Sequence, residues 1–175
     1  MTEYYFAPLE GITGCLFRQV HHRHFPQMDR YFMPFLVPHE KRTFNGKELR
    51  EMDPENNKGI WVNPQIMTNK AEDFISTARK LQNRGYEEVN LNLGCPSKTV
   101  VSKGRGSGFL AYPEQLDAFL DQIFQKLDMK ISVKTRIGVE DEEEFGRLLE
   151  IYNHYPLSEL IIHPRLQRDQ YKFPI

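Results

Sequence analysis

The sequence is poor in cysteine, lacks any long apolar run and carries no excess of basic residues. Its two cysteines could form one disulfide, but a chain without an export signal should keep Cys15 and Cys95 reduced. The apolar runs are short and strand-like, below the roughly 18 residues that cross a bilayer. The N-terminus also lacks the basic and apolar segments of a signal peptide. We therefore expect a cytoplasmic protein that does not contact a membrane.

Net charge and chain length restrict how the protein can contact a nucleic acid and how many domains it can form. The 23 Lys and Arg residues balance 24 Asp and Glu residues, which gives a formal net charge of -1. Any contact with a nucleic acid must therefore use a local basic patch rather than the whole surface. With 175 residues, 39% of them hydrophobic, the chain is large enough for one globular domain with a real core.

Predicted strands and helices alternate along the chain. Short apolar runs predict six strands, at residues 4–9, 29–36, 59–67, 88–93, 130–136 and 159–163. Apolar residues at helical spacing predict four helices, at residues 13–24, 69–84, 113–127 and 141–152, with Thr13 and Asn69 as N-caps of the first two. The polar stretch 38–58 predicts a long loop or a short irregular helix.

This alternation predicts a parallel sheet, because each parallel connection needs a crossover long enough for a helix. A doubly wound sheet and a barrel both fit. The absence of a dinucleotide fingerprint, the polar residues at several strand ends and the uninterrupted repeat favour an α/β fold of the (β/α) TIM-barrel type. About six of the eight strands are present. Residues 1–175 should thus form a partial TIM-barrel domain, with open strand edges that invite strand exchange or a homo-oligomer.

Side chains capable of chemistry follow the predicted strands. In a TIM barrel the carboxyl ends of the strands meet on one rim, where active sites lie. This rim should gather an amide, a thiol, an amine and an imidazole, each of which has an ordinary structural explanation on its own. The candidates are Pro8, Leu9, Gln65, Asn92, Cys95, Lys134, Arg136, His163 and Arg165.

Cys95 is the candidate for proton transfer. A cysteine inside a strand is more often a small buried hydrophobe, but Cys95 follows the strand between Gly94 and Pro96, where a fixed turn would point the thiol toward the barrel mouth. A thiol with a reference pKa of about 8.5 is mostly protonated at neutral pH, so a general acid is favoured over a nucleophile.

Lys134 and Gln65 are candidates for holding a ring with polar edges. Lys134 could simply pack its stem and extend its amine to solvent, and Gln65 could be a satisfied amide at a strand end. An inward-pointing cation, however, would stabilise an anionic ring such as reduced flavin. The amide of Gln65 can both donate and accept, which suits the uracil-like edge of a flavin.

Other motifs carry less information. Residues 98–108 form a basic, glycine-rich stretch that could approach a phosphate backbone, but it lacks the spacing of a P-loop or Rossmann motif and could equally be a flexible loop. His21, His22 and His24 have no carboxylate or cysteine partner at ligand spacing, so no metal site is predicted.

Several motifs, taken in order and spacing, resemble the tRNA-dihydrouridine synthase family over essentially the whole chain. They are residues 7–13 (APLEGIT), 64–66 (PQI), 90–98 (NLNLGCPSK), 104–110 (GRGSGFL), 132–138 (SVKTRIG) and 163–167 (HPRLQ), with Tyr171. The resemblance implies an FMN-containing TIM barrel that reduces particular uridines in tRNA to dihydrouridine, with NADPH as electron source. It further implies that hydride goes to C6 of the uracil while Cys95 protonates C5.

The resemblance also implies roles for the other candidates. Pro8, Leu9, Gln65, Lys134 and His163 would contact the flavin. Asn92 would hold the substrate base, with Lys98, Arg136 and Arg165 as further substrate contacts. Members of the family carry two more barrel strands, which hold the FMN phosphate, and a helical domain that grips tRNA. We expect both to be absent from residues 1–175, so this chain alone should hold flavin weakly or not at all.

Two alternatives remain at this stage. One is another FMN barrel, such as a dihydroorotate dehydrogenase, which the stretch from His163 to Arg165 argues against. The other is a non-catalytic RNA-binding or assembly module that uses Lys98, Lys103 and Arg105. Such a module would bind tRNA in a salt-sensitive way and need no flavin.

Overall fold

The computed structural model describes residues 2–38 and 44–172. In these residues the strands form two sheets whose pairs are all parallel, as the alternation of strands and helices predicts. The first sheet has the order β1 (Tyr5–Phe6), β2 (Arg30–Phe32), β3 (Val62–Asn63). The second has the order β4 (Gln65–Ile66), β5 (Glu88–Leu93), β6 (Lys130–Gly138), β7 (Glu159–Leu166).

The predicted strand at residues 59–67 is divided at Pro64 into β3 and β4. Proline has no backbone N–H, so it cannot donate to a ladder, although its carbonyl still accepts a hydrogen bond from the Asn90 N–H at 2.9 Å. β3 pairs with β2, β4 pairs with β5, and an isolated bridge joins Leu36 to Ile66. The two sheets therefore follow one another in the strand order of a partial barrel.

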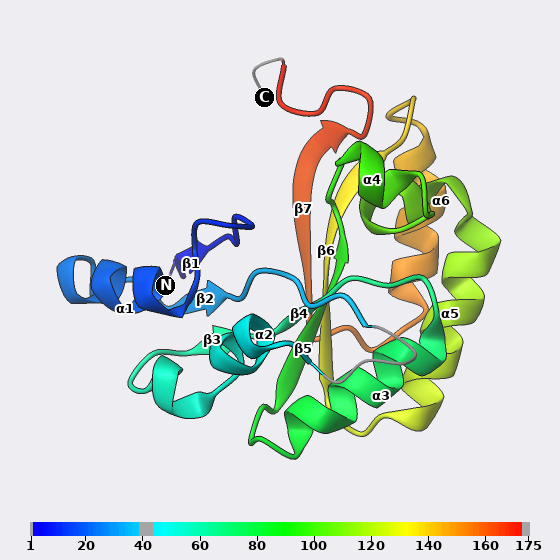
Figure 1. Ribbon diagram of the computed structural model, residues 1–175. Helices are drawn as coiled ribbons and strands as arrows, with labels where there is room; N and C mark the ends of the chain where they lie inside the picture. Colours follow the sequence, from blue (N-terminus) through cyan, green and yellow to red (C-terminus); the bar gives the residue numbers. More distant parts are fainter. Residues whose placement is uncertain (1, 39–43, 173–175) are drawn as a thin grey trace.

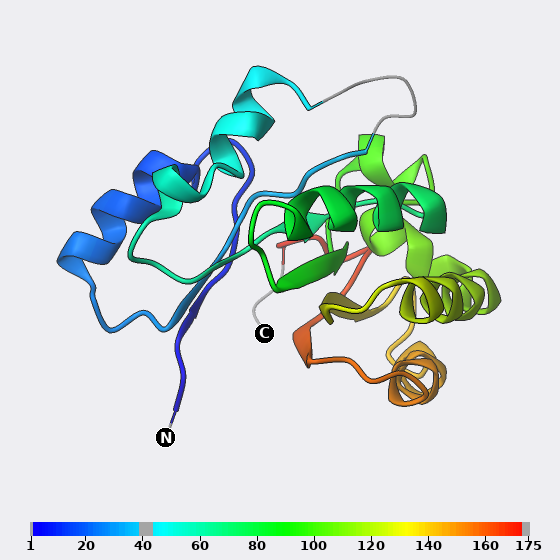
Figure 2. The same cartoon turned by 90° about the horizontal axis from the view of Figure 1, so that it is seen from below.

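Helices follow one another around the outside of the strands (Figures 1 and 2). The four predicted helices are confirmed as α1 (Cys15–His24), α3 (Ala71–Gln82), α5 (Pro113–Lys126) and α6 (Glu144–Asn153). Beneath α3 and α5, Phe119 meets Phe74 and Phe109 edge to face, with ring centroids 5.7 and 5.5 Å apart. These aromatic contacts join α5 to α3 and to the segment that carries Phe109.

Both predicted N-caps are wrong by one residue. Helix α1 begins after Gly14, and the Thr13 hydroxyl instead accepts a hydrogen bond from the Leu9 N–H at 2.8 Å. Helix α3 begins after Lys70, while the Asn69 amide donates to the Lys103 carbonyl at 3.1 Å. In both cases a partner outside the helix competes successfully for the capping side chain.

Short helices occupy the stretch 38–58, where a short irregular helix was one of the two predictions, and the glycine-rich stretch, which was expected as a loop. In the stretch 38–58, of which 39–43 lie outside the described residues, α2 (Gly46–Glu51) begins with a capping box and η1 (Pro54–Asn57) follows. The glycine-rich stretch is likewise ordered into α4 (Lys98–Val101) and η2 (Gly106–Ala111). A Cβ on Gly108 would lie 2.8 Å from the Val101 Cα, so this glycine permits close packing of backbones rather than flexibility.

Arg30 connects the two sheets at the amino ends of the strands. Its guanidinium lies over the rings of Trp61 (4.0 Å) and Tyr5 (4.8 Å). It also lies 3.4 Å from a carboxylate oxygen of Glu159 and 3.6 Å from one of Glu88. One side chain thus links β2 with β5 and β7, which belong to the other sheet. No helix in the described part of the chain is long and apolar enough to span a membrane.

Candidate active site

A cleft of about 210 Å³ lies at the carboxyl ends of the strands, the rim that the sequence predicts for the chemistry. The structure brings Cys95, Asn92 and all the predicted flavin contacts together around this cleft. Its lining consists of Pro8, Leu9, Glu10, Pro34, Phe35, Gln65, Asn92, Gly94, Cys95, Lys134, His163 and Tyr171. The convergence comes from the loops after β1 and β2 and from the ends of β4, β5, β6 and β7.

The turn that carries Cys95 is held through every backbone polar group of Gly94 and Cys95. Both N–H groups donate to the Asn92 Oδ1, at 3.1 and 3.0 Å. The Cys95 carbonyl accepts from the N–H and the hydroxyl of Ser107, at 3.0 and 2.9 Å. The Gly94 carbonyl accepts from the Arg136 Nε at 2.9 Å. A half-buried free thiol is therefore presented on a rigid backbone.

Buried amides continue from this turn across the sheet. The Asn92 Nδ2 donates to the Gln65 Oε1 at 2.7 Å, the Gln65 Nε2 donates to the Asn90 Oδ1 at 2.9 Å, and the Asn90 Nδ2 donates to the Ser132 hydroxyl at 2.9 Å. These bonds fix the orientation of each amide. Because a primary amide has two N–H donors, Asn92 and Gln65 each keep one N–H for a ligand in the cleft.

Glycines in η2 allow that helix to approach the turn. A Cβ added to Gly106, whose φ is +55°, would lie 2.7 Å from the Cys95 carbonyl oxygen. Gly106 therefore has two reasons to lack a side chain, a left-handed backbone and a close backbone contact. The glycine-rich stretch thus supports the thiol from behind, which is a role different from the predicted approach to a phosphate backbone.

The electrostatics of the cleft are dominated by positive charge. Burial, followed by the nearby charge of Arg136, lowers the pKa of the Lys134 amine. Burial also lowers the pKa of His163 to about 4, with the charges of Arg136, Lys134 and Arg165 adding to the effect. His163 is therefore neutral at physiological pH and can accept or donate a hydrogen bond without adding charge. A negatively charged ligand would stabilise the protonated form of Lys134.

Three predicted substrate contacts lie outside the lining of the cleft. Lys98 is exposed at the start of α4, three residues after Cys95. Arg165 lies half-buried on β7. Arg136 is fully buried, at 0% exposure, behind the turn that carries Cys95. Of the residues that sequence reasoning missed, Pro34 and Phe35 come from the loop after β2, where no chemically reactive side chain gave a signal.

His21 of α1 serves packing. The His21 Nδ1 lies 2.9 Å from the Tyr31 hydroxyl, and its ring packs against Phe6 with centroids 4.5 Å apart. Across the described residues 2–38 and 44–172, no group of three or more His, Cys, Asp or Glu side chains is arranged to hold a metal ion.

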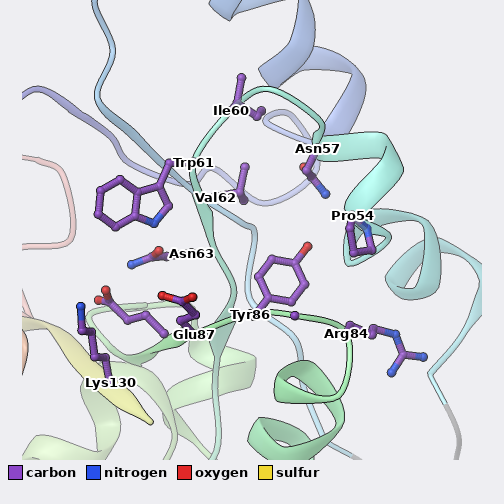
Figure 3. Close-up of a pocket in the computed structure, with 12 residues that line it drawn as sticks. Pro54, Asn57, Ile60, Trp61, Val62, Asn63, Arg84, Tyr86, Glu87 and Lys130 are labelled. Atoms are coloured by element: carbon purple, nitrogen blue, oxygen red, sulfur yellow. The ribbon is translucent and has the colours of Figure 1, made fainter.

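A larger cleft, of about 300 Å³, opens at the opposite, amino ends of the strands (Figure 3). Trp61, Asn63, Glu87 and Lys130 gather on one side of it and Tyr86 lies on the other. The pKa of Tyr86 is raised to about 12, mainly by burial, and its hydroxyl donates to the Met52 carbonyl at 3.1 Å. This cleft contains an amine, that of Lys130, but its lining has no thiol or imidazole, so the cleft around Cys95 is the better candidate for catalysis.

Comparison with known proteins identifies the family of the chain. The family model for dihydrouridine synthase (Dus) matches residues 5–175. A probable tRNA-dihydrouridine synthase 1 from Synechocystis is 29% identical over 150 residues, which cover 82% of this chain and 41% of that protein. A probable tRNA-dihydrouridine synthase from Staphylococcus aureus strain COL is 27% identical over 172 residues, covering 95% of this chain and 50% of that protein.

A third relative matches a shorter region. The tRNA-dihydrouridine(20/20a) synthase of Shewanella oneidensis is 36% identical over 96 residues, which cover 53% of this chain and 29% of that protein. The chain spans half or less of the length of these curated relatives. Since the family model covers nearly all of its residues, the chain belongs to the dihydrouridine synthase family.

Proposed function

We propose that this chain carries the catalytic centre of a flavin-dependent oxidoreductase that reduces uridine in tRNA to 5,6-dihydrouridine. The observation that carries the proposal is the cleft itself. It places the thiol of Cys95, on a turn whose backbone groups are all bonded, in one cleft with the half-buried Lys134 and the neutral imidazole of His163. The relatives bearing the name tRNA-dihydrouridine synthase support this choice of substrate.

The residues around the cleft fit a flavin. Gln65 retains one N–H and spare acceptor capacity for a ring with polar edges, and the amine of Lys134 would hold an anionic ring edge. Pro8 and Leu9 supply apolar lining, and His163 lines the same cleft without adding charge. We propose FMN as the flavin and NADPH as its reductant. When bound, the flavin would supply the hydride that goes to C6 of the uracil.

Cys95 acts as the acid in this proposal. Reduction of the uracil C5–C6 double bond needs one hydride at C6 and one proton at C5, and the thiol supplies the proton as its S–H bond breaks. The thiolate left behind regains a proton from solvent. The lining holds one carboxylate, Glu10, which is engaged by the Lys47 amine at 2.9 Å. The cleft therefore offers the Cys95 thiol as its most suitable proton donor.

Substrate recognition is assigned to the rim. The free N–H of Asn92 points to a role in hydrogen bonding the uracil, which must leave its stack to enter the cleft. The exposed amine of Lys98 would meet an RNA phosphate, and Arg165 is a further candidate. Residues 1–175 are proposed to form part of a TIM-barrel catalytic domain. The remaining barrel strands, a tRNA-binding helical domain or a second copy of the chain would complete the site.

Flavin binding tests the proposal directly. The purified protein is mixed with FMN, desalted and examined by visible absorbance alongside size-exclusion chromatography, with Lys134→Met as the matched variant. Because the chain alone should hold flavin weakly, the proposal expects retained flavin to elute with an oligomer in which a second copy completes the barrel, and expects Lys134→Met to retain markedly less. Salt-sensitive tRNA binding that needs no flavin and survives Cys95→Ala would instead favour the RNA-binding module.

A further inference from the structure

Arg136 has a different position from the other charged residues of the site. It is fully buried, and its described hydrogen-bond partners are all backbone carbonyls. We infer that Arg136 is a positioning residue, which ties the turn carrying Cys95 to the segment 166–171 on the other side of the cleft. The inference rests on the proposed function for its meaning in catalysis, but its structural content does not depend on flavin or tRNA.

The guanidinium bridges two separate parts of the chain. Its Nε donates to the Gly94 carbonyl at 2.9 Å, while its Nη1 donates to the carbonyls of Leu166 at 2.8 Å and Gln170 at 3.0 Å. The Tyr171 ring lies over the same guanidinium, 5.2 Å from its carbon to the ring centroid. Arg136 thus contacts Gly94, which precedes Cys95, and Gln170, which precedes Tyr171. Both Cys95 and Tyr171 line the cleft.

Only arginine has the shape for this task. Its planar fork presents N–H donors in several fixed directions, whereas a lysine ammonium is a compact group on a flexible stem. A buried guanidinium is costly to desolvate, so its hydrogen bonds to carbonyls must be well formed. Its charge also has a use, because Arg136 contributes to the lowered pKa values of Lys134 and His163.

The backbone of segment 166–171 directs two carbonyls, those of Leu166 and Gln170, at Arg136. Gln170 has φ +50°, and it is the one non-glycine residue with positive φ within the described ranges. The turn is closed by the Leu166 N–H, which donates to the Asp169 carboxylate at 3.2 Å. It places Tyr171 beside His163, with ring centroids 6.1 Å apart. An uncommon backbone conformation is retained where surrounding contacts determine it.

Arg136 therefore holds the turn that carries Cys95 and the segment that carries Tyr171 in a fixed position relative to each other. Loosening Arg136 should let the turn open more often and should change the reactivity of the Cys95 thiol. A residue that only contacted substrate would leave the thiol of the free protein unchanged. The two roles are therefore separable without substrate.

Alkylation of Cys95 by iodoacetamide tests the inference. In a Cys15→Ala background, which leaves Cys95 as the sole thiol, the rate is compared between Arg136 and Arg136→Lys, a change that keeps the charge. We expect the variant to react about fivefold faster or more, since it loses hydrogen bonds that keep the turn closed. Arg147→Lys, an exposed arginine on α6, is the matched control and should react at the wild-type rate.

Circular dichroism establishes that each variant is folded. A folded Arg136→Lys variant that reacts within about twofold of wild type would overturn the inference. If Arg136→Lys does not fold, Asp169→Ala decides, because it weakens the far end of the same connection at a partly exposed site. Faster alkylation in Asp169→Ala would then support the inference, and an unchanged rate would refute it. Failure of flavin binding would count against the proposed function alone.

Discussion

Replacing Arg18 by methionine should destabilise the fold severely and loosen one wall of the cleft. Arg18 is fully buried on α1. Its guanidinium bonds Glu51 at 3.0 Å, Asn57 at 2.7 Å and the carbonyl of Thr13 at 2.9 Å. The bond to Thr13 anchors the loop that carries Pro8 and Leu9. The substitution leaves the Glu51 carboxylate buried without its cation.

Breaking a buried ion pair by removing one partner costs about 3–5 kcal/mol. That loss is a large share of the roughly 5–15 kcal/mol that stabilises a typical domain. With an m-value of about 2 kcal/mol per M, the midpoint of urea unfolding should fall by about 1.5–2.5 M. Unfolding followed by circular dichroism measures this shift. Flavin retention should fall in the same variant because the Pro8 and Leu9 wall loses its anchor.

Two comparisons make this prediction refutable. Adding Glu51→Gln to Arg18→Met removes the stranded charge, and should recover roughly 1–2 kcal/mol. Arg147→Met breaks an exposed ion pair to Glu150 and should change stability by less than about 1 kcal/mol. A loss below about 1 kcal/mol in Arg18→Met, equal to that of Arg147→Met, would show that the buried network does not hold the fold.

Three further predictions concern the cleft. Cys95→Ala should retain flavin yet fail to reduce tRNA, and a variant that still reduces tRNA at the wild-type rate would exclude Cys95 as the acid. Asn92→Ala leaves the buried Oε1 of Gln65 without its donor and should cost about 1–3 kcal/mol in urea unfolding, whereas no loss would contradict the amide network. His163 should titrate near pH 4 by NMR, and Lys134→Met should raise that midpoint; a wild-type midpoint above 6 would refute the assignment. Because the folded protein takes up this proton at lower pH than the unfolded chain, stability should decline as pH falls from about 6.5 toward 4.

Much of the fold follows from local sequence patterns. Alternating strands and helices require parallel pairing, and parallel strands place Gln65, Cys95, Lys134 and His163 at the same end of the sheet. These side chains lie at or near the carboxyl ends of the predicted strands, where the position along the chain indicates the position in space. The convergence on one cleft could therefore be predicted without knowing the detailed packing.

Features that depend on distant partners could not be predicted. The caps at Thr13 and Asn69 failed because contacts outside each helix recruited those side chains. Lys134 and Arg136 lie two residues apart on one strand, yet only Lys134 lines the cleft. The register of β6 shifts between Arg136 and Gly138, and the Arg136 side chain lies behind the turn instead. Local spacing carries no information about these contacts.

The most direct test of the central claim is the dihydrouridine content of tRNA. Uridine-containing tRNA that lacks the modification is incubated without oxygen with NADPH and the flavin-loaded protein, as wild type and as Cys95→Ala, and the nucleosides are analysed by mass spectrometry. The account predicts dihydrouridine with the wild-type protein and little or none with Cys95→Ala. Flavin-loaded wild-type protein that oxidises NADPH but forms no dihydrouridine would contradict it.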